Sequence, residues 1–336
     1  MRAVAWSGPH AFAIEDRKDP EPGPGELVVR VEGCGICGTD LHLYKGEFAA
    51  TAGITPGHEM AGVVEGGDGV AAGTHVAIDP MLSCMSCADC RNGQSPICQR
   101  STLMGISANG GLQQRFAVPA ANCYPLPEGI DPVLGSLAEP VAVAVRGIER
   151  ADIQMGARVL ILGAGTIGLT TAMLLRDRVA EVAITARYPH QREAALKLGA
   201  SAVFESGSND LKAWGRARRP DVVIETVGGT ADTLAEAFKV VRGGGTILTL
   251  GVFTGMTQVN GFRLVNEEIK VIGSVMYGRT ASNSEFGVAV RELARYRADL
   301  PVLQTLTFPL ARVTEAFDAA LDKTRGTLKV TVLPNA

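Results

Sequence analysis

The chain has 336 residues, more than one ordinary hydrophobic core usually holds, so two domains are expected. Its hydrophobic content of 46% and its 40 glycines favour a well-buried α/β protein with many turns. The formal charge of −3 argues against a nucleic-acid-binding surface, and no apolar run approaches the roughly 18 residues of a membrane span. The N-terminal sequence MRAVAWSGPH lacks the apolar centre of a signal peptide. A cytoplasmic protein without membrane or nucleic-acid partners is therefore expected.

Residues 1–135 are predicted to form a small, mostly β domain. Short strand-like runs such as Leu27–Val31 are interrupted by the proline- and glycine-rich sequence PEPGPGE. Glycine recurs through residues 62–73 and again at Gly110 and Gly111. This punctuation favours strands joined by tight turns over helices.

Two fragments in this region carry side chains that bind zinc, CGICGTDLH (Cys34–His42) and GHEM (Gly57–Met60). Cys37, His58 and Glu59 offer a thiolate, an imidazole and a carboxylate, all common zinc ligands. A site with three protein ligands keeps one position open for a substrate oxygen. The alternative for His58 is a histidine that is buried for packing alone.

Four further cysteines are crowded into the loop PMLSCMSCADCRNGQSPICQR, at Cys84, Cys87, Cys90 and Cys98. Four thiolates on one loop can surround a tetrahedral zinc ion and leave no open position for chemistry. An iron–sulfur cluster is the competing interpretation. In a chain with seven cysteines, this crowding predicts reduced, metal-binding thiolates, and we interpret the group as a structural zinc site.

The character of the chain changes near Ala138. A helical run at residues 140–148 is followed by a strand at 159–162, a glycine turn, and an apolar helix that opens at Thr166. Strands and helices then alternate, with strands expected at 182–185, 221–225 and 245–250 and helices at 191–198 and 230–240. This alternation is typical of a doubly wound parallel sheet. A mixed segment ends the chain, with a last strand at 328–332.

The glycine turn follows the pattern G-x-G-x-x-G of dinucleotide-binding proteins, with Gly163, Gly165 and Gly168. The first glycine permits the tight turn, the second lets the backbone approach a pyrophosphate, and the third lets the helix pack closely on the strand. The helix N-terminus then offers free N–H groups and partial positive charge to the phosphates. The motif alone is weak, but here a strand precedes it and a helix follows it.

The order of these motifs closely resembles that of the zinc-dependent medium-chain alcohol dehydrogenases: Cys37 with GHE, then the four-cysteine loop, then the dinucleotide turn. The resemblance extends to LDKTRGTLKVTVLP (Leu321–Pro334). It implies a GroES-like, mostly β catalytic domain at residues 1–139 and 276–336 and a Rossmann domain at 140–275. The classical members have a cysteine near Glu139, and its absence here points to the polyol- and threonine-type branch.

The resemblance also implies roles for individual residues. Cys37 and His58 correspond to catalytic zinc ligands, Thr39 to the hydroxyl that takes the alcohol proton, and His42 to the group that passes this proton to solvent. The remaining ligand is either Glu59 or Glu139, and a carboxylate favoured by a helix dipole is the structural alternative for Glu139.

The nicotinamide cofactor is expected to be NADP rather than NAD. NAD-type folds carry an acid at the end of the second strand, where this chain has Ala186 followed by Arg187. An arginine can pair with a 2′-phosphate, and Arg192 and His190 could add to the pocket. The full set of expected cofactor-binding residues is Gly163, Gly165, Thr166, Ile167, Gly168, Ala186, Arg187, Arg192, Thr226, Val227 and Gly251.

These observations predict an oxidoreductase with two zinc ions per chain that transfers hydride between an alcohol and NAD(P). A secondary alcohol is favoured, such as a polyol, sugar, cyclitol or amino alcohol, with Tyr44, Phe48, Met81 and Asn109 as a mixed lining. A primary alcohol dehydrogenase and an inactive structural or regulatory member of the fold are the alternatives. The strand in VIGSVMYG (Val271–Gly278) resembles the one that pairs two subunits, so a homodimer or homotetramer is expected.

Overall fold

The computed structural model describes residues 1–47, 51–280 and 283–336. It divides into two compact units, one formed by Met1–Ala142 with Tyr277–Ala336 and the other by Val143–Met276. These boundaries lie close to the expected ones, and the first of them falls inside helix α4 (Ala138–Arg150). No helix of the described residues is long and apolar enough to cross a membrane.

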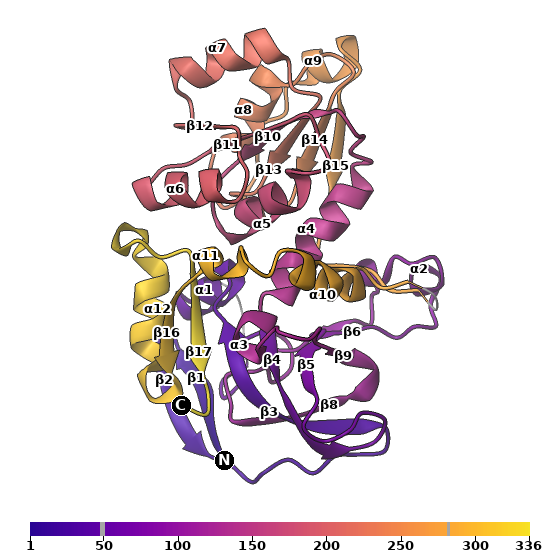
Figure 1. Ribbon diagram of the computed structural model, residues 1–336, viewed down its shortest axis with the longest axis vertical. Helices are drawn as coiled ribbons and strands as arrows, with labels where there is room; N and C mark the ends of the chain where they lie inside the picture. The colour runs from indigo at the N-terminus through magenta and orange to yellow at the C-terminus, as the bar shows by residue number, and fades with distance from the viewer. Residues whose placement is uncertain (48–50, 281–282) are drawn as a thin grey trace. The chain divides into compact units, whose positions relative to one another are not determined.

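The first unit is built on a seven-stranded sheet in which strands from both ends of the chain lie side by side (Figure 1). The C-terminal strand β17 (Lys329–Leu333) pairs antiparallel with β3 (Glu26–Gly35), which pairs with β4 (Glu59–Gly67). The sheet is completed by β5 (His75–Ile78), β8 (Arg115–Pro119), β9 (Cys123–Pro125) and β16 (Gln304–Pro309). Two small sheets pair β1 (Arg2–Gly8) with β2 (Ala11–Asp16) and β6 (Met81–Leu82) with β7 (Thr102–Leu103).

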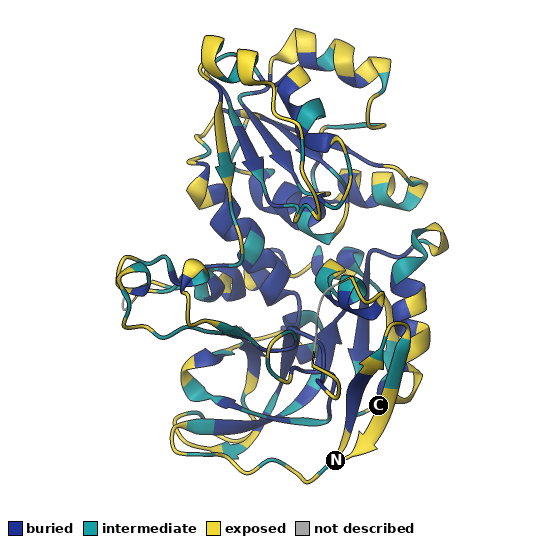
Figure 2. Cartoon of the chain, turned by 180° about the vertical axis from the view of Figure 1, so that it is seen from behind, coloured by how far each residue is buried: buried dark blue, intermediate teal, exposed yellow. Residues whose placement is uncertain are grey.

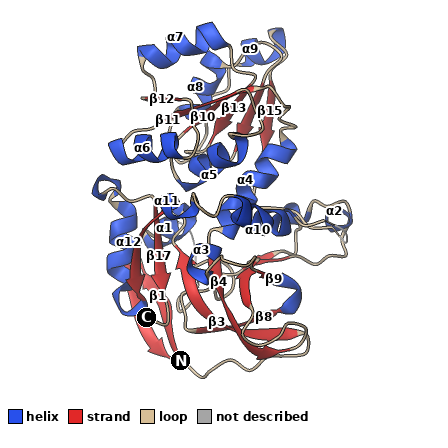
Figure 3. Cartoon of the chain, viewed as in Figure 1, coloured by secondary structure: helices blue, strands red, loops and turns tan. Residues whose placement is uncertain are grey.

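Short helices cover and connect these strands (Figure 3): α1 (Gly38–Tyr44), α2 (Ala88–Arg91), α3 (Pro132–Gly135), α10 (Glu285–Arg295), α11 (Leu300–Leu303) and α12 (Val313–Leu321). Helix α12 buries Val313, Ala316, Phe317 and Ala320, which recur at helical spacing, in the core formed by the sheet. Burial of this apolar stripe against strands near the N-terminus joins the two ends of the chain in one domain.

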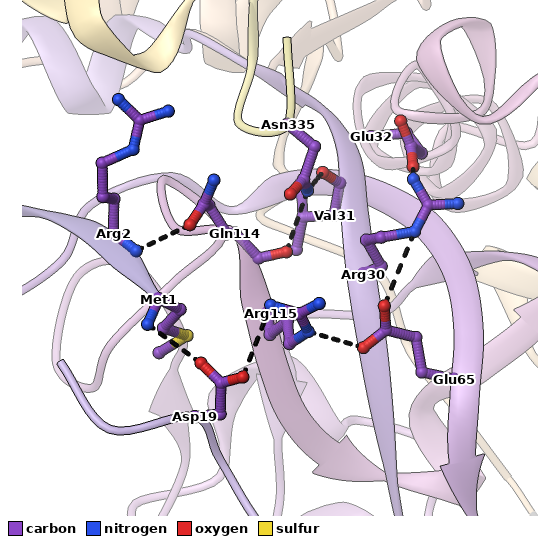
Figure 4. Close-up of polar contacts among 10 residues, drawn as sticks. All are labelled: Met1, Arg2, Asp19, Arg30, Val31, Glu32, Glu65, Gln114, Arg115 and Asn335. Carbon is purple, nitrogen blue, oxygen red and sulfur yellow. Dashed lines mark hydrogen bonds and ion pairs between the residues drawn. The ribbon is translucent and has the colours of Figure 1, made fainter. Parts of the chain in front are cut away.

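Polar contacts at the end of the first unit reinforce this closure (Figure 4). The Asn335 side chain donates to the carbonyl oxygens of Val31 (2.8 Å) and Gln114 (3.0 Å). The N-terminal ammonium lies 2.9 Å from Asp19, and Arg115 pairs with Glu65 at 2.7 Å. Such exposed pairs add little free energy individually, so the apolar core remains the main source of stability.

The second unit is a six-stranded parallel sheet in the order β12-β11-β10-β13-β14-β15. The strands are β10 (Arg158–Leu162), β11 (Glu181–Thr185), β12 (Ala202–Phe204), β13 (Val222–Glu225), β14 (Thr246–Thr249) and β15 (Lys270–Gly273). The central strands are buried (Figure 2), as continuous apolar runs in parallel sheets require. This strand order is that of the Rossmann fold and confirms the predicted doubly wound sheet.

The helices of the second unit are α5 (Thr166–Leu175), α6 (Pro189–Lys197), α7 (Asn209–Arg218), α8 (Thr233–Val240) and α9 (Gly261–Asn266). The alternation inferred from the sequence omitted β12, α7 and α9, and α9 has no buried residue. Strand β12 has only three residues, all half-buried, and α7 buries only Leu211 and Gly215. Neither therefore carries the strong apolar periodicity on which the prediction depends.

Candidate functional site

The four-cysteine loop brings its thiols together. Cys84 Sγ lies 3.8 Å from Cys90 Sγ and 3.5 Å from Cys98 Sγ, and Cys87 Sγ lies 3.9 Å from Cys98 Sγ. Among the described residues, this is the one group of three or more possible ligands whose atoms all lie within 4.8 Å of one another. Four sulfurs around one zinc ion, each about 2.3 Å from it, would be about 3.8 Å apart. The spacing therefore fits one tetrahedral ion better than a cluster of several irons.

The loop also prepares Cys84 as a thiolate. Backbone and side-chain contacts with Ser86 and the N–H of Cys87 lower the pKa of Cys84 to about 5. The Arg100 guanidinium donates to Cys84 Sγ at 3.1 Å. Burial, followed by contacts with the other thiols, instead raises the pKa of Cys90 to about 12. A cation would relieve this crowding of thiols, which is the behaviour expected of a metal site.

The second predicted group is organised around the start of helix α1. Cys37 is its N-cap, and Asp40, fully buried, accepts the Cys37 backbone N–H through Oδ2 at 2.9 Å. The other oxygen of Asp40 lies 3.5 Å from Nδ1 of His58. Histidines that bind a metal usually direct their second ring nitrogen to such a carboxylate. Burial alone would lower the pKa of His58. The charges and hydrogen bonds of Asp40 and Cys37 outweigh burial and raise this pKa well above the usual range.

Glu59, next along the chain, has a different partner. Lys329 of β17 donates to Glu59 Oε1 at 2.6 Å, and both side chains are almost fully buried. The second oxygen, Oε2, is buried without a hydrogen-bond partner among the described residues. A buried carboxylate oxygen without a partner is costly, so this atom is suited to receive a cation.

Glu139 is also buried, in the first turn of α4. Burial raises its pKa to about 7, partly offset by His58, whereas Glu59 raises it further. Tyr277 interacts with Glu139, and burial, followed by the charges of Glu139 and Asp79, raises the pKa of this phenol well above its usual range. Glu139 therefore faces the same buried polar region as His58 and Glu59.

The ligand atoms of Cys37, His58, Glu59 and Glu139 are less closely spaced than those of the four-cysteine loop. No three of them lie within 4.8 Å of one another in the part of the chain that the structure describes. The electrostatic contacts of His58, Glu59 and Glu139 put these groups in one polar region, and closure around an ion would require side-chain movements. Their donor types and the unpaired Oε2 fit a zinc ion.

The expected proton path lies on helix α1. The Thr39 hydroxyl is 3.9 Å from Cys37 Sγ, and His42 follows one helical turn later on the same face. His42 Nδ1 is hydrogen-bonded to Glu47, a half-exposed carboxylate. The chain therefore carries a hydroxyl, an imidazole and a carboxylate in order from the cysteine toward solvent.

The dinucleotide turn has the expected geometry. Gly163 has a φ of +107°, a conformation that disfavours other residues. A Cβ on Gly168 would lie 1.9 Å from the Gly163 carbonyl oxygen, so only glycine permits this packing. A Cβ on Gly165 would meet nothing within 4 Å, which leaves open space at the N-terminus of α5, where Thr166 and Ile167 begin the helix.

Three other expected cofactor residues occupy strand ends of the same sheet. The Thr226 hydroxyl donates to the carbonyl oxygens of Leu162 and Gly163, so it supports the turn directly. Val227 is half exposed, and Gly251 packs against Gly228 and the buried Glu225. Because ligands of such sheets bind at the carboxyl ends of the strands where the strand order reverses, these positions border the expected crevice.

The end of β11 carries the residues expected to choose between the two nicotinamide cofactors. Ala186 is buried and presents no carboxylate, and Arg187 is exposed with its guanidinium 5.6 Å from the Tyr188 ring centroid. Arg192 donates to the Val203 carbonyl oxygen at 2.8 Å, and His190 stacks on Tyr188. Arg187 therefore presents an exposed guanidinium directly after the position at which NAD-type folds carry an acid.

Several residues were not anticipated from the sequence. Asp40, Tyr277 and Lys329 surround the predicted ligands, and each lies in a fragment quoted above but was given no role there. Asp40 lies three residues after Cys37, which is a capping-box spacing and a usable signal. Of the expected substrate lining, Tyr44 is instead buried in an aromatic cluster with Phe12 and Phe317, and Phe48 lies outside the described residues. Met81 is buried, and Asn109 is exposed and accepts the Thr55 N–H through Oδ1.

Two family models match the chain. Residues 23–128 match the alcohol dehydrogenase GroES-like domain, and residues 166–295 match the zinc-binding dehydrogenase domain. A 2-dehydro-3-deoxy-L-galactonate 5-dehydrogenase from Pseudoalteromonas atlantica is 30% identical over 100% of this chain and 99% of its own length. An L-threonine 3-dehydrogenase from Saccharopolyspora erythraea is 33% identical, covering 95% of this chain and 96% of its own.

Solved structures agree with these relatives. A zinc-binding dehydrogenase from Sinorhizobium meliloti bound to NADP has a TM-score of 0.89 at 30% identity, covering 99% of both chains. An alcohol dehydrogenase from Escherichia coli complexed with NADH has a TM-score of 0.90 at 26% identity, again covering 99% of both. The chain therefore belongs to the zinc-dependent medium-chain alcohol dehydrogenases, oxidoreductases that interconvert an alcohol and its carbonyl compound with a nicotinamide cofactor.

Proposed function

We propose that the catalytic centre of this dehydrogenase is the buried region around Cys37 and His58, and that it oxidises a secondary alcohol group to a ketone. The observation that carries this assignment is the imidazole of His58, which lies next to Cys37 and directs Nδ1 to the buried Asp40. A carboxylate on Nδ1 leaves Nε2 as the metal-binding atom. Polyols, sugar acids and amino alcohols are the favoured substrates, because two relatives, at 30% and 33% identity, are named for a sugar acid and for threonine.

When bound, zinc supplies a Lewis acid that polarises the substrate oxygen, and the nicotinamide accepts the hydride. The chain's own residues hold and move the proton. Thr39 lies beside Cys37 and is placed to accept the hydroxyl proton of the alcohol. His42, fixed by Glu47, receives it and passes it to solvent.

We assign the third protein ligand of this centre to Glu59, with Glu139 as the alternative. Glu59 directly follows His58, and its buried Oε2 has no partner among the described residues. Glu139 is also buried, but its carboxylate interacts with Tyr277. We place the second ion of each chain in the four-cysteine loop, which gives two zinc ions per chain.

A substrate screen tests the proposed function. Secondary alcohols, polyols, aldonates and amino alcohols are offered with NADP or NAD, and reduced nicotinamide is followed by its absorbance, alongside metal content per chain. Turnover of a secondary alcohol with two zinc ions per chain is the expected result. Turnover of primary alcohols alone would instead favour a primary alcohol dehydrogenase. One tightly held zinc without any turnover would favour the inactive structural member of the fold.

We infer that NADP is the preferred cofactor and that Arg187 binds its 2′-phosphate. A charge-assisted contact of this kind contributes about 1.5–3 kcal/mol, which is roughly tenfold or more in affinity. Arg187→Ala is therefore expected to weaken NADP binding about tenfold or more and to change NAD binding by less than about twofold. Fluorescence titration of both cofactors checks this. Lys197→Ala is the control, because it removes an exposed cation in the last turn of α6 that is not among the expected cofactor-binding residues. Equal weakening of both cofactors by Arg187→Ala would overturn the assignment.

We infer that two copies associate through the edge strand β15. This strand is outermost in the sheet, and Val271 and Val275 are more than one-third exposed. Neighbouring helix α9 exposes Phe262 (75%) and Val265 (73%). An exposed edge strand with such apolar neighbours favours pairing with another strand.

The double variant Phe262→Asp/Val271→Asp is expected to convert a dimer to a monomer at micromolar concentration, as measured by sedimentation velocity. Leu196→Asp, at an exposed leucine (52%) on α6, is the control and should leave the assembly unchanged. If the wild-type protein is a tetramer, its conversion to a dimer by the double variant would also place one interface at β15. A wild-type monomer would contradict the assignment.

A further inference from the structure

Lys329 is a buried lysine whose position in the sheet places it against both parts of the proposed metal site. Its ammonium donates to Glu59 Oε1 at 2.6 Å and to the carbonyl oxygen of Ile36 at 2.9 Å. Ile36 directly precedes Cys37, and Glu59 directly follows His58. One side chain thus connects the two segments that carry the proposed ligands.

Strand register produces this arrangement. Strand β17 pairs antiparallel with β3, with Thr331 opposite Gly35, and the Ile36 N–H donates to the Val330 carbonyl oxygen at 2.9 Å. Continuing this register places Lys329 opposite Cys37. Strand β4 pairs with the other edge of β3, with Glu59 opposite Gly35. The two side chains therefore meet across the end of β3.

Gly35 makes the meeting possible. A Cβ at this position would lie 2.1 Å from Glu59 Oε2 and 3.2 Å from its carboxyl carbon. The carboxylate lies over the bare backbone of Gly35, with one oxygen on Lys329 and the other unpaired. Burying two charges is costly, and a buried pair that contributes little net stability is explained better by a positional role.

We propose that Lys329 is a positioning residue of the metal centre, which holds Oε1 of Glu59 so that Oε2 alone is directed to the metal. This inference rests on the proposed function, because it takes Glu59 as the third ligand. Lys329 also fixes the backbone before Cys37, so that thiolate and carboxylate keep a set separation. Residues behind metal ligands typically change metal affinity 10–100-fold when they are replaced.

The test uses full-length protein with cobalt in place of zinc, because the visible spectrum of cobalt reports its ligands. The part of the spectrum that disappears in Cys37→Ala belongs to this site rather than to the four-cysteine loop. Lys329→Met is expected to shift this part of the spectrum and to speed metal loss to a chelator about tenfold. Lys329→Arg, which keeps a charged donor, is expected to restore both.

Lys323 offers a matched control. Burial, followed by the charge of Lys329, lowers the pKa of Lys323 to about 8, and Cys37 opposes this shift, so Lys323 lies in the same region. Among the described residues, Lys323 makes no hydrogen bond to Glu59. Lys323→Met removes a nearby positive charge without removing the Glu59 contact. It should leave the cobalt spectrum unchanged. An identical effect of Lys323→Met and Lys329→Met would mean that charge alone matters and would overturn the positioning role.

Further variants separate the outcomes. Should Lys329→Met fail to fold because Glu59 is left buried and unpaired, Lys329→Gln keeps a neutral donor and is expected to show the same spectral shift in weaker form. A wild-type spectrum and release rate in either variant would overturn the proposal. Wild-type protein without any Cys37-dependent cobalt signal would instead overturn the proposed function. An unchanged spectrum in Glu59→Gln would show that Glu59 is not a ligand, and the proposal would fall with that assignment.

Discussion

Replacement of Cys37 with alanine is expected to lower kcat/KM by about a thousandfold or more and to remove one of two zinc ions per chain. Cys37 caps helix α1 beside Thr39, and its thiol interacts with His58. Without this ligand the metal would be held by His58 and a carboxylate alone. Lewis-acid activation contributes several kcal/mol to the transition state, and each 1.36 kcal/mol is about tenfold in rate.

Cys34→Ala is the control for this experiment. Cys34 is fully buried in β3, and a Cβ on Gly57 would lie 2.4 Å from its sulfur, so its role is packing. The variant should lose some thermal stability and keep both zinc ions and most of its activity. Near-normal turnover in Cys37→Ala, with the metal content unchanged, would show that catalysis occurs elsewhere.

Replacement of Cys84 with serine is expected to remove the other zinc ion and to lower Tm by about 6–12 °C. Loss of a structural metal is among the changes that destabilise a protein most. A decrease of about 3 kcal/mol in the free energy of unfolding lowers Tm by this amount at about 2–4 °C per kcal/mol. The loop has few other restraints, because its helix α2 has only four residues and buries only Cys90. Metal analysis and calorimetry check the result, and limited proteolysis should show cleavage within residues 84–98.

Cys123→Ala is the matched control for the loop. Cys123 is a buried thiol in β9, remote in sequence from the four, and burial raises its pKa to about 12. Its replacement removes one thiol that lies outside the four-cysteine loop and should leave metal content unchanged. Equal zinc content and equal Tm in Cys84→Ser and wild type would show that the cluster does not hold a structural metal.

Much of the fold could be predicted because its signals are local. The strand, glycine turn and helix of residues 157–175 identify a dinucleotide-binding unit, and the apolar strands that follow predict a parallel sheet, which the structure confirms. Strand β12 and helix α7 were omitted because both are short of buried apolar residues. The C-terminal segment was assigned to the first domain through the family resemblance rather than through its own composition.

By itself, the sequence determined which chemical groups this protein carries and which of them are neighbours along the chain. The four cysteines between residues 84 and 98 need only a short loop to meet, and the glycine turn needs only a strand before it and a helix after it. Such patterns are readable because chain connectivity already holds their members together.

Only the tertiary structure decided which buried charges meet. Lys329 and Glu59 are 270 residues apart, and Tyr277 lies far along the chain from Glu139. The contact of Lys329 with Glu59 depends on the register of β17 and β4 on the two edges of β3, and on a glycine, Gly35, at the position where the carboxylate must lie. A one-residue shift in either strand would turn these side chains to the opposite face. Burial and strand register, which act between distant segments, therefore set the partners of the proposed ligands.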